Sequence, residues 1–133
     1  MRLYLTFIAL IITVNCTFTQ WQQIPNGMGV NRYIYTLETN GSTIFAGAST
    51  GGVFLSSNNG NNWQQTSLTL PVIHELFSDG NYLYAGTSQQ GVYYTTNNGS
   101  NWIHSALNNK TIYSFTKKGN TLFAGSDSNG VYR

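Results

Sequence analysis

Short apolar runs separated by polar turns fill the chain from about residue 33 onwards, and this pattern returns every 39 residues. Three of the runs open with isoleucine at this spacing, at Ile34, Ile73 and Ile112. Each is followed by a glycine-containing turn, a run that ends in Ala-Gly and a run that opens with Gly-Val. Runs of β-branched and aromatic residues between glycine turns, with no helical period, predict β-strands.

Two features of the repeat indicate how these strands pack. The first turn of each unit has glycine after Asn, Asp or Lys, at Gly41, Gly80 and Gly119. Asn-Gly and Asp-Gly accept positive φ, so these turns predict tight hairpins. The Ala-Gly pairs at residues 46–47, 85–86 and 124–125 carry little side chain, which lets a neighbouring strand approach closely.

A fourth strand is expected to begin at Trp63 and again at Trp102, so each unit becomes a four-stranded antiparallel meander. Four strands in about 40 residues are typical of one blade of a β-propeller. We therefore expect an all-β chain with blades at 33–71 and 72–110 and a partial blade at 111–133. Residues 21–32 are expected to form a lone outer strand and a link, because Trp21-Gln22-Gln23 matches Trp63-Gln64-Gln65.

These units amount to about three blades, whereas a closed propeller typically has four to eight. Two explanations stay open. The sequence is a fragment of a longer protein, which we prefer, or two copies exchange terminal strands and form a homodimeric six-bladed ring. A separate copy would expose a blade face and unpaired strand edges.

The turn before each fourth strand carries the most specific motif. It reads Ser-Ser-Asn-Asn-Gly-Asn-Asn-Trp at 56–63 and Thr-Thr-Asn-Asn-Gly-Ser-Asn-Trp at 95–102. In such a turn a short polar side chain bonds backbone groups, glycine takes positive φ and tryptophan anchors the hairpin. We assign a structural role to eight residues: Ser56, Asn58, Gly60, Trp63, Thr95, Asn97, Gly99 and Trp102.

The motif resembles the Asp-box, or bacterial neuraminidase repeat, Ser-x-Asp-x-Gly-x-Thr-Trp. Asn58 and Asn97 stand where that family usually has Asp, and Asn62 and Asn101 stand where it usually has Thr. Over about residues 33–133 the repeats are similar to those of sortilin-type and photosystem II assembly-factor-type propellers. The resemblance implies a propeller in which this turn is structural and not catalytic. An assembly-factor function would further need a photosynthetic source.

The segment 1–20 has the layout of an export signal. Arg2 precedes an apolar run from Leu3 to Val14, which is too short to span a bilayer, and a short uncharged segment follows. We expect cleavage near Thr19 or Gln20, a secreted or periplasmic protein, and no membrane insertion after cleavage. Cys16 is the only cysteine; lipid modification there is an alternative, although the preceding residues are a poor lipobox.

Charged residues make up only 8% of the chain, and residues 21–133 hold five basic against four acidic side chains. This balance provides no basic surface for nucleic acid. The one adjacent basic pair, Lys117-Lys118, is expected in a solvated turn. Solubility is expected to come from Asn, Gln, Ser and Thr side chains.

The sequence lacks the set of residues that a sialidase is expected to use. A sialidase is expected to need an arginine cluster, a Tyr-Glu nucleophile pair and an acid. Arg32 and Arg133 stand at opposite ends of the mature sequence, and Glu75 has no acidic partner in the repeat pattern. We therefore predict a protein that is not an enzyme and has no catalytic residues; the alternative is part of a sialidase-like hydrolase whose catalytic residues lie outside this chain.

Metal and cofactor sites are not predicted. His74 and His104 lie on different strand types, their counterparts in the repeat are not ligands, and no carboxylate or cysteine is spaced to join them. The Asn-rich turns lack the carboxylates that calcium needs. Asn40, Asn98 and Asn109 begin N-glycosylation sequons, which matter only in a eukaryotic secretory pathway.

The expected function is a non-catalytic module that binds or scaffolds an unknown protein or glycan outside the cytoplasm. A meander places the first and third turns at one end of the blades. The other end carries the second turns, 48–51 and 87–90, and the links 66–72 and 105–111. We expect a ligand at this second end, called the link end below.

Overall fold

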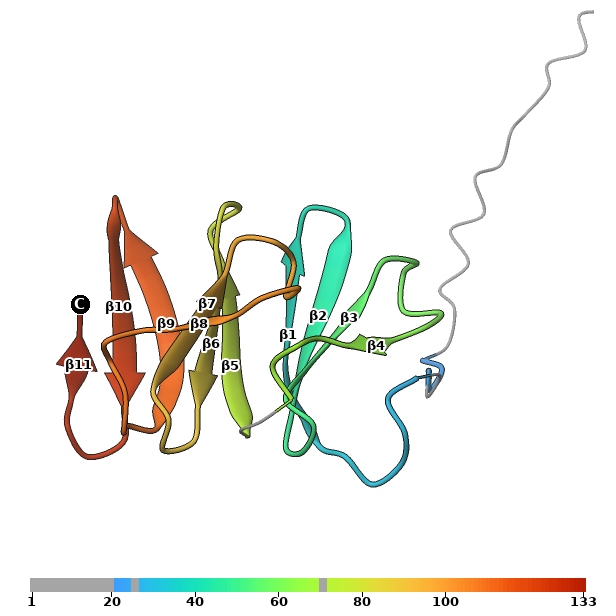
Figure 1. Cartoon of the computed structure of the whole chain (residues 1–133), viewed down its shortest axis with the longest axis horizontal. Coiled ribbons are helices and arrows are strands. Elements are labelled where there is room, and N and C mark those ends of the chain that lie inside the picture. The colour runs from blue at the N-terminus through green and yellow to red at the C-terminus, as the bar shows by residue number, and fades with distance from the viewer. Residues whose placement is uncertain (1–20, 25–26, 70–71) are drawn as a thin grey trace, which may run out of the picture.

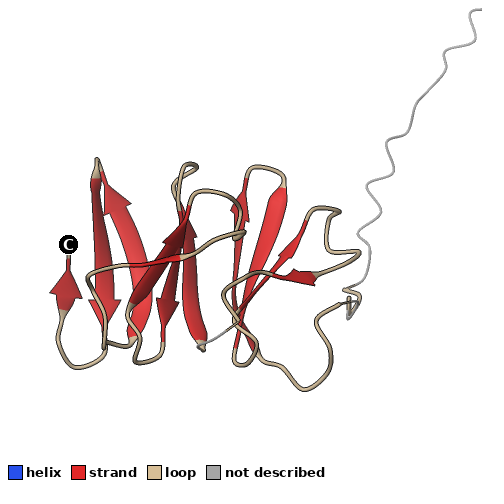
Figure 2. Ribbon diagram, viewed as in Figure 1, coloured by secondary structure: helices blue, strands red, loops and turns tan. Residues whose placement is uncertain are grey.

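The computed structural model describes residues 21–24, 27–69 and 72–133, and within these ranges it contains strands and no helix (Figures 1 and 2). Sheet A consists of β1 (Ile34–Asn40), β2 (Thr43–Ala48), β3 (Val53–Ser56) and β4 (Gln64–Gln65). Sheet B consists of β5 (Ile73–Ser78), β6 (Leu83–Thr87), β7 (Val92–Thr95) and β8 (Ile103–His104). Sheet C consists of β9 (Ile112–Lys118), β10 (Thr121–Ser126) and β11 (Val131–Tyr132).

Neighbouring strands in every sheet are antiparallel and consecutive in sequence, so each sheet is a meander. The three sheets stand side by side in Figure 1, with sheet B between sheets A and C. Their first strands, β1, β5 and β9, lie next to one another in that order. The predicted all-β architecture and the four-strand unit are therefore confirmed. The expected signal at residues 1–20 lies outside the described residues.

The hairpin turns form where the sequence predicts them. Asn40 pairs with Thr43 across a two-residue loop in which Gly41 has φ 60°. The equivalent loop between β9 and β10 contains Gly119 at φ 58°. Glycine populates this left-handed region without a Cβ penalty, which is why these positions close tight turns.

The largest of three hydrophobic core clusters lies between sheets A and B. Phe45 and Val53 of sheet A pack there against Leu76 and Leu83 of sheet B, and all four are buried. Gly47 makes this contact close, because an added Cβ would stand 2.6 Å from Cγ2 of Ile73 on the next sheet. Since real Cβ contacts are essentially never this short, the predicted close approach at the Ala-Gly pair is confirmed here.

Three expectations are wrong. Residues 21–24 form no strand, and Trp21 is fully exposed, because no described strand lies beside it to pair with. The two fourth strands begin at Gln64 and Ile103, one residue after the tryptophans where they were expected to begin. Lys117 and Lys118 end strand β9 rather than occupying a turn, and Lys117 forms an ion pair.

Candidate functional site

A β-bulge interrupts the first strand of every sheet at the same position of the repeat. In sheet A, Ile34 pairs with Ala48 and Thr36 with Gly47, which leaves Tyr35 as the extra residue. The same shift leaves out His74 in sheet B and Tyr113 in sheet C. Bulges re-aim side chains and occur often beside functional sites. Three rings are thus presented from adjacent strands at the link end.

These three side chains form a continuous row, which we call the aromatic row. The His74 ring lies 5.8 Å from that of Tyr35, with 27° between their planes, and 4.8 Å from that of Tyr113, with 50°. Tyr35 and Tyr113 are each 53% exposed, whereas His74 is half-buried between them. The row therefore offers aromatic faces and two phenol groups to solvent.

Burial lowers the pKa of the His74 imidazole below its ordinary value. An imidazole with a lowered pKa is uncharged at neutral pH. A neutral ring between two tyrosines is an apolar stacking surface rather than a charged group.

Two carboxylates lie on neighbouring first strands, Glu38 on β1 and Glu75 on β5. Burial, and secondarily the charge of Glu38, raises the pKa of Glu75. Glu75 is half-buried on β5, where the other sheets have Thr36 and Ser114. The structure thus gives Glu75 an acidic neighbour that the repeat pattern alone did not reveal.

Uncharged polar groups also lie at the link end. Ser49 Oγ accepts a hydrogen bond from the Tyr33 N–H at 3.1 Å. Tyr93 donates its hydroxyl to Gln90 Oε1 at 3.0 Å and stacks on His104, with ring centroids 4.3 Å apart and 6° between the planes. His104 Nε2 also lies within hydrogen-bond distance of the Gln90 carbonyl oxygen. Both histidines therefore have stacking partners.

The eight motif residues lie at the opposite end, where they build two matched turns. Ser56 Oγ accepts the N–H of Gly60 at 2.9 Å, and Asn58 Oδ1 accepts the N–H of Asn62 at 2.9 Å. The hydroxyl of Ser56 also donates to Asn58 Oδ1 at 3.0 Å. Asn59 and Gly60 both have positive φ, 56° and 84°. The side chains thus replace backbone partners in the turn.

The second turn repeats these bonds at the equivalent positions of the next unit. Thr95 Oγ1 accepts the N–H of Gly99 at 3.1 Å, and Asn97 Oδ1 accepts that of Asn101 at 3.0 Å. Trp63 is buried against Phe54, while Trp102 packs on the core between sheets A and B. The turns therefore hold the hairpins together, and the side chains of Ser56, Asn58, Thr95 and Asn97 make their hydrogen bonds within the turns.

A family model for the DUF6242 beta propeller domain matches residues 8–117 of this chain. The chain belongs to this family. The match covers sheets A and B and most of β9, and it begins inside the segment expected to be an export signal. No curated protein and no solved structure gives a significant match.

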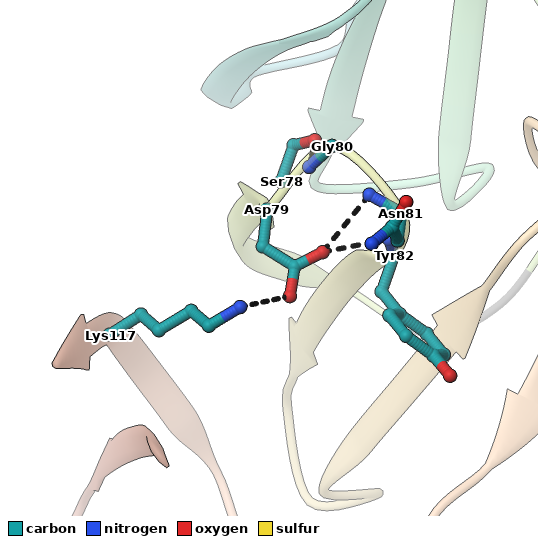
Figure 3. Close-up of polar contacts among 6 residues, drawn as sticks. All are labelled: Ser78, Asp79, Gly80, Asn81, Tyr82 and Lys117. Carbon is teal, nitrogen blue, oxygen red and sulfur yellow. Dashed lines mark hydrogen bonds and ion pairs between the residues drawn. The ribbon is translucent and has the colours of Figure 1, made fainter. Parts of the chain in front are cut away.

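One ion pair links sheets B and C of this DUF6242 propeller at the end opposite the aromatic row (Figure 3). Lys117 Nζ lies 2.7 Å from Asp79 Oδ2, while Asp79 Oδ1 accepts the N–H groups of Asn81 and Tyr82 at 3.1 and 2.8 Å. The hydrogen bond from Lys117 is the main cause that lowers the Asp79 pKa.

Other candidate residues of the DUF6242 propeller do not come together. Arg32 lies over the ring of Phe54 in sheet A, whereas Arg133 follows β11 of sheet C. Residues 21–24, 27–69 and 72–133 contain no group of three or more His, Cys, Asp or Glu side chains placed to hold a metal ion. No helix in these ranges is long and apolar enough to cross a membrane.

The aromatic row is the feature that the sequence did not reveal. Tyr35, His74 and Tyr113 recur at the repeat spacing, which marked them as equivalent positions. What could have revealed the row in the sequence is that a ring-bearing residue, Tyr or His, stands at the same repeat position in all three units. The bulge that turns these rings toward one another depends on pairing with the second strand, which the repeat spacing does not encode.

Proposed function

We propose that this propeller is an exported, non-catalytic binding module whose ligand lies on the aromatic row. The observation that supports this function is the bulge at one repeat position in all three sheets, which presents Tyr35, His74 and Tyr113 as one surface. Tyrosine is suited to binding because its ring contributes apolar area and its hydroxyl contributes a hydrogen bond.

The chemistry of the aromatic row favours an uncharged ligand. His74 is neutral and stacks between two tyrosine rings, and the link end carries the hydroxyl of Ser49 and the amide of Gln90 as well as the charged side chains of Lys110 and Asp127. A glycan offers hydroxyl groups and apolar ring faces, which match such a surface. We therefore propose a neutral glycan as the ligand, and an uncharged protein segment is the alternative to be tested beside it.

Binding to arrays of neutral glycans and of uncharged peptides tests this proposal, using protein expressed from the full sequence. Tyr113→Ala should weaken binding more than about tenfold, as expected for an aromatic residue that carries a contact. Tyr82→Ala is the matched control, since Tyr82 is an exposed tyrosine in a first turn, at the far end of the sheets. Equal binding by both variants and the wild type would refute the site.

Export is tested separately from binding. Mass spectrometry of the protein secreted by an expression host should find an N-terminus near Trp21. A mature protein that keeps Met1 or a membrane-bound Leu3–Val14 segment would refute export and leave the binding proposal intact.

A hydrolase with catalytic residues inside this chain is a separate candidate with one specific observation behind it. The pKa of Glu75 is raised by burial and by the charge of Glu38, and a carboxyl with a raised pKa near a second carboxylate can serve as a general acid. Release of an aryl leaving group from aryl sialosides or aryl glycosides would support it if Glu75→Gln removed the activity. No release by the wild type would leave the binding module as the better description of this chain.

A further inference from the structure

Trp102 closes the interface between sheets A and B. Its ring packs on the core cluster there, and its Nε1 donates to Thr66 Oγ1 at 3.3 Å. Thr66 belongs to the link that follows sheet A, and its hydroxyl also accepts the N–H of Leu68 at 3.3 Å. Trp102, which precedes the fourth strand of sheet B, therefore fills a space lined by sheet A and by the link that follows sheet A.

The interface between sheets B and C contains an apolar cavity of about 360 Å³ at the equivalent place. Six of its lining residues stand one repeat, or 39 residues, after members of the core cluster between sheets A and B. These lining residues are Tyr84, Val92, Leu107, Phe115, Leu122 and Ala124, and their counterparts in the same order are Phe45, Val53, Leu68, Leu76, Leu83 and Ala85. The cavity is thus the counterpart of the space that Trp102 helps to close. We call it the tryptophan slot.

The polar partner of the indole is also present in the slot. Ser105 stands one repeat after Thr66, lines the cavity, and accepts the N–H of Leu107 at 3.2 Å as Thr66 accepts that of Leu68. A hydroxyl oxygen can accept a second hydrogen bond. An indole in the slot would therefore find the same acceptor that Trp102 uses.

Trp21 has the properties of the missing occupant. Of the three tryptophans, Trp63 and Trp102 are packed in the protein, whereas Trp21 is fully exposed. Trp21-Gln22-Gln23 repeats the sequence of Trp63-Gln64-Gln65, which supplies a packed tryptophan and strand β4. Residues 21–24 lie beside sheet A, at the opposite end of the molecule from β11 (Figure 1). The segment is therefore better placed to reach sheet C of another molecule.

We propose that residues 21–23 of a second copy of this chain add a fourth strand to sheet C and insert Trp21 into the tryptophan slot. Strand β11 pairs with β10 alone among the described strands, so its other edge is open. The pairs Leu55–Gln64 and Phe54–Gln65 in sheet A set the expected register, in which Gln22 of one copy faces Arg133 of the other and Gln23 faces Tyr132. Reciprocal exchange gives a dimer with six four-stranded sheets.

Disulfide trapping tests this register directly. In a Cys16→Ser background, the double variant Gln22→Cys with Arg133→Cys should oxidise to a covalent dimer, because the Cα atoms of directly opposed antiparallel residues lie within the range that a disulfide spans. Gln22→Cys with Ser57→Cys is the matched control, since Ser57 lies in the exposed turn after β3 of sheet A. The proposal predicts a dimer band for the first pair alone, and equal cross-linking of both pairs would overturn it.

Light scattering on a size-exclusion column provides an independent test. The wild type should elute with the mass of a dimer, and Trp21→Ala should raise the dissociation constant more than about 30-fold, as for a central aromatic anchor. Ser105→Ala should raise it about 2- to 10-fold through loss of one hydrogen bond. Trp21 lies on the surface of the separate chain, so its removal should leave the monomer's circular dichroism spectrum unchanged.

Two results would contradict strand exchange. A folded wild-type monomer at high micromolar concentration would mean that another segment fills the slot, such as one that follows Arg133 in a longer chain. A dimer that Trp21→Ala leaves intact would mean that the copies associate through a different surface.

Discussion

The two interfaces between the sheets are built from equivalent strands, yet they are closed by different means. Between sheets A and B, Trp102 fills the space beside the core and bonds to Thr66. Between sheets B and C, the equivalent space is a cavity, and an ion pair joins Asp79 to Lys117. Three strands are thus enough to form sheet C. At the interface between sheets A and B, however, the space beside the core is filled by Trp102, the residue that precedes the fourth strand of sheet B.

The same contrast appears at one glycine of the repeat. An added Cβ at Gly91 would lie 1.9 Å from the Leu107 carbonyl oxygen, because the link after sheet B folds back over this position. At Gly130, the counterpart in sheet C, an added Cβ would meet nothing within 4 Å. Both glycines have positive φ, 76° and 80°, so they differ in their surroundings and not in their backbone.

The largest effect is therefore expected from Gly91→Ala. Backbone strain and overpacking together should lower the free energy of unfolding by about 3–4 kcal/mol. Gly130→Ala, with strain alone, should cost about 1 kcal/mol in the monomer, where no link covers it. Urea unfolding of both variants measures the difference, and equal costs would show that a link also covers Gly130.

Trp102→Ala should make the first interface resemble the second. Removing a packed tryptophan leaves a cavity and an unused acceptor on Thr66, and we expect a loss of about 2–3 kcal/mol, because the ring is only partly buried. Trp102→Phe is the control that keeps most of the apolar contact and loses only the indole N–H. If the alanine variant is no less stable than the phenylalanine variant, the ring does not fill the interface.

The charges at the two interfaces also differ. Glu75 and Glu38 repel each other across β1 and β5, and the pKa of Glu75 is raised by burial and by this repulsion. A raised carboxyl pKa means that the protonated form stabilises the fold below about pH 4.5 and that this contribution is lost as pH rises. Glu75→Gln should therefore stabilise the protein at pH 7, by less than about 1 kcal/mol, and this gain should vanish near pH 4.

Thermal unfolding of the Glu75→Gln variant and the wild type across this pH range measures the difference. Glu38→Gln is the companion variant, because it removes the repulsion and leaves the burial of Glu75 in place. A gain that is constant with pH would show that ionisation of Glu75 is not its cause.

The smallest effect is expected from the ion pair of the second interface. Asp79→Asn keeps an oxygen for the N–H groups of Asn81 and Tyr82 but removes the charge beside Lys117 (Figure 3). The side chains of Lys117 and Asp79 are 32% and 10% exposed, and a pair that stays in contact with solvent is typically worth about 0–1 kcal/mol. The lowered Asp79 pKa means that this contribution is lost as pH falls below the ordinary pKa of the carboxyl. A double-mutant cycle with Lys117→Met measures the coupling, and a coupling energy above about 2 kcal/mol would contradict a surface pair.

The repeat spacing was sufficient to predict the sheets, the turn glycines and the internal bonds of the turns at 56–63 and 95–102, because these are local features. It did not place Lys117 in β9, since the length of a strand depends on its partner. Nor did it reveal the bulge at Tyr35, which is a matter of register between β1 and β2. The expected strand at Trp21 fails for a related reason, as a strand needs a neighbour.

Hydrogen exchange at β11 tests most directly whether sheet C is completed from outside the single chain. Val131 and Tyr132 lie on an open edge in the separate molecule, whereas β3 and β7 are each flanked by two strands. If residues 21–23 of a second copy complete sheet C, exchange at β11 should be slow in the wild-type protein at high concentration and fast in Trp21→Ala, with β3 and β7 unchanged. Equally fast exchange at β11 in both proteins would contradict it.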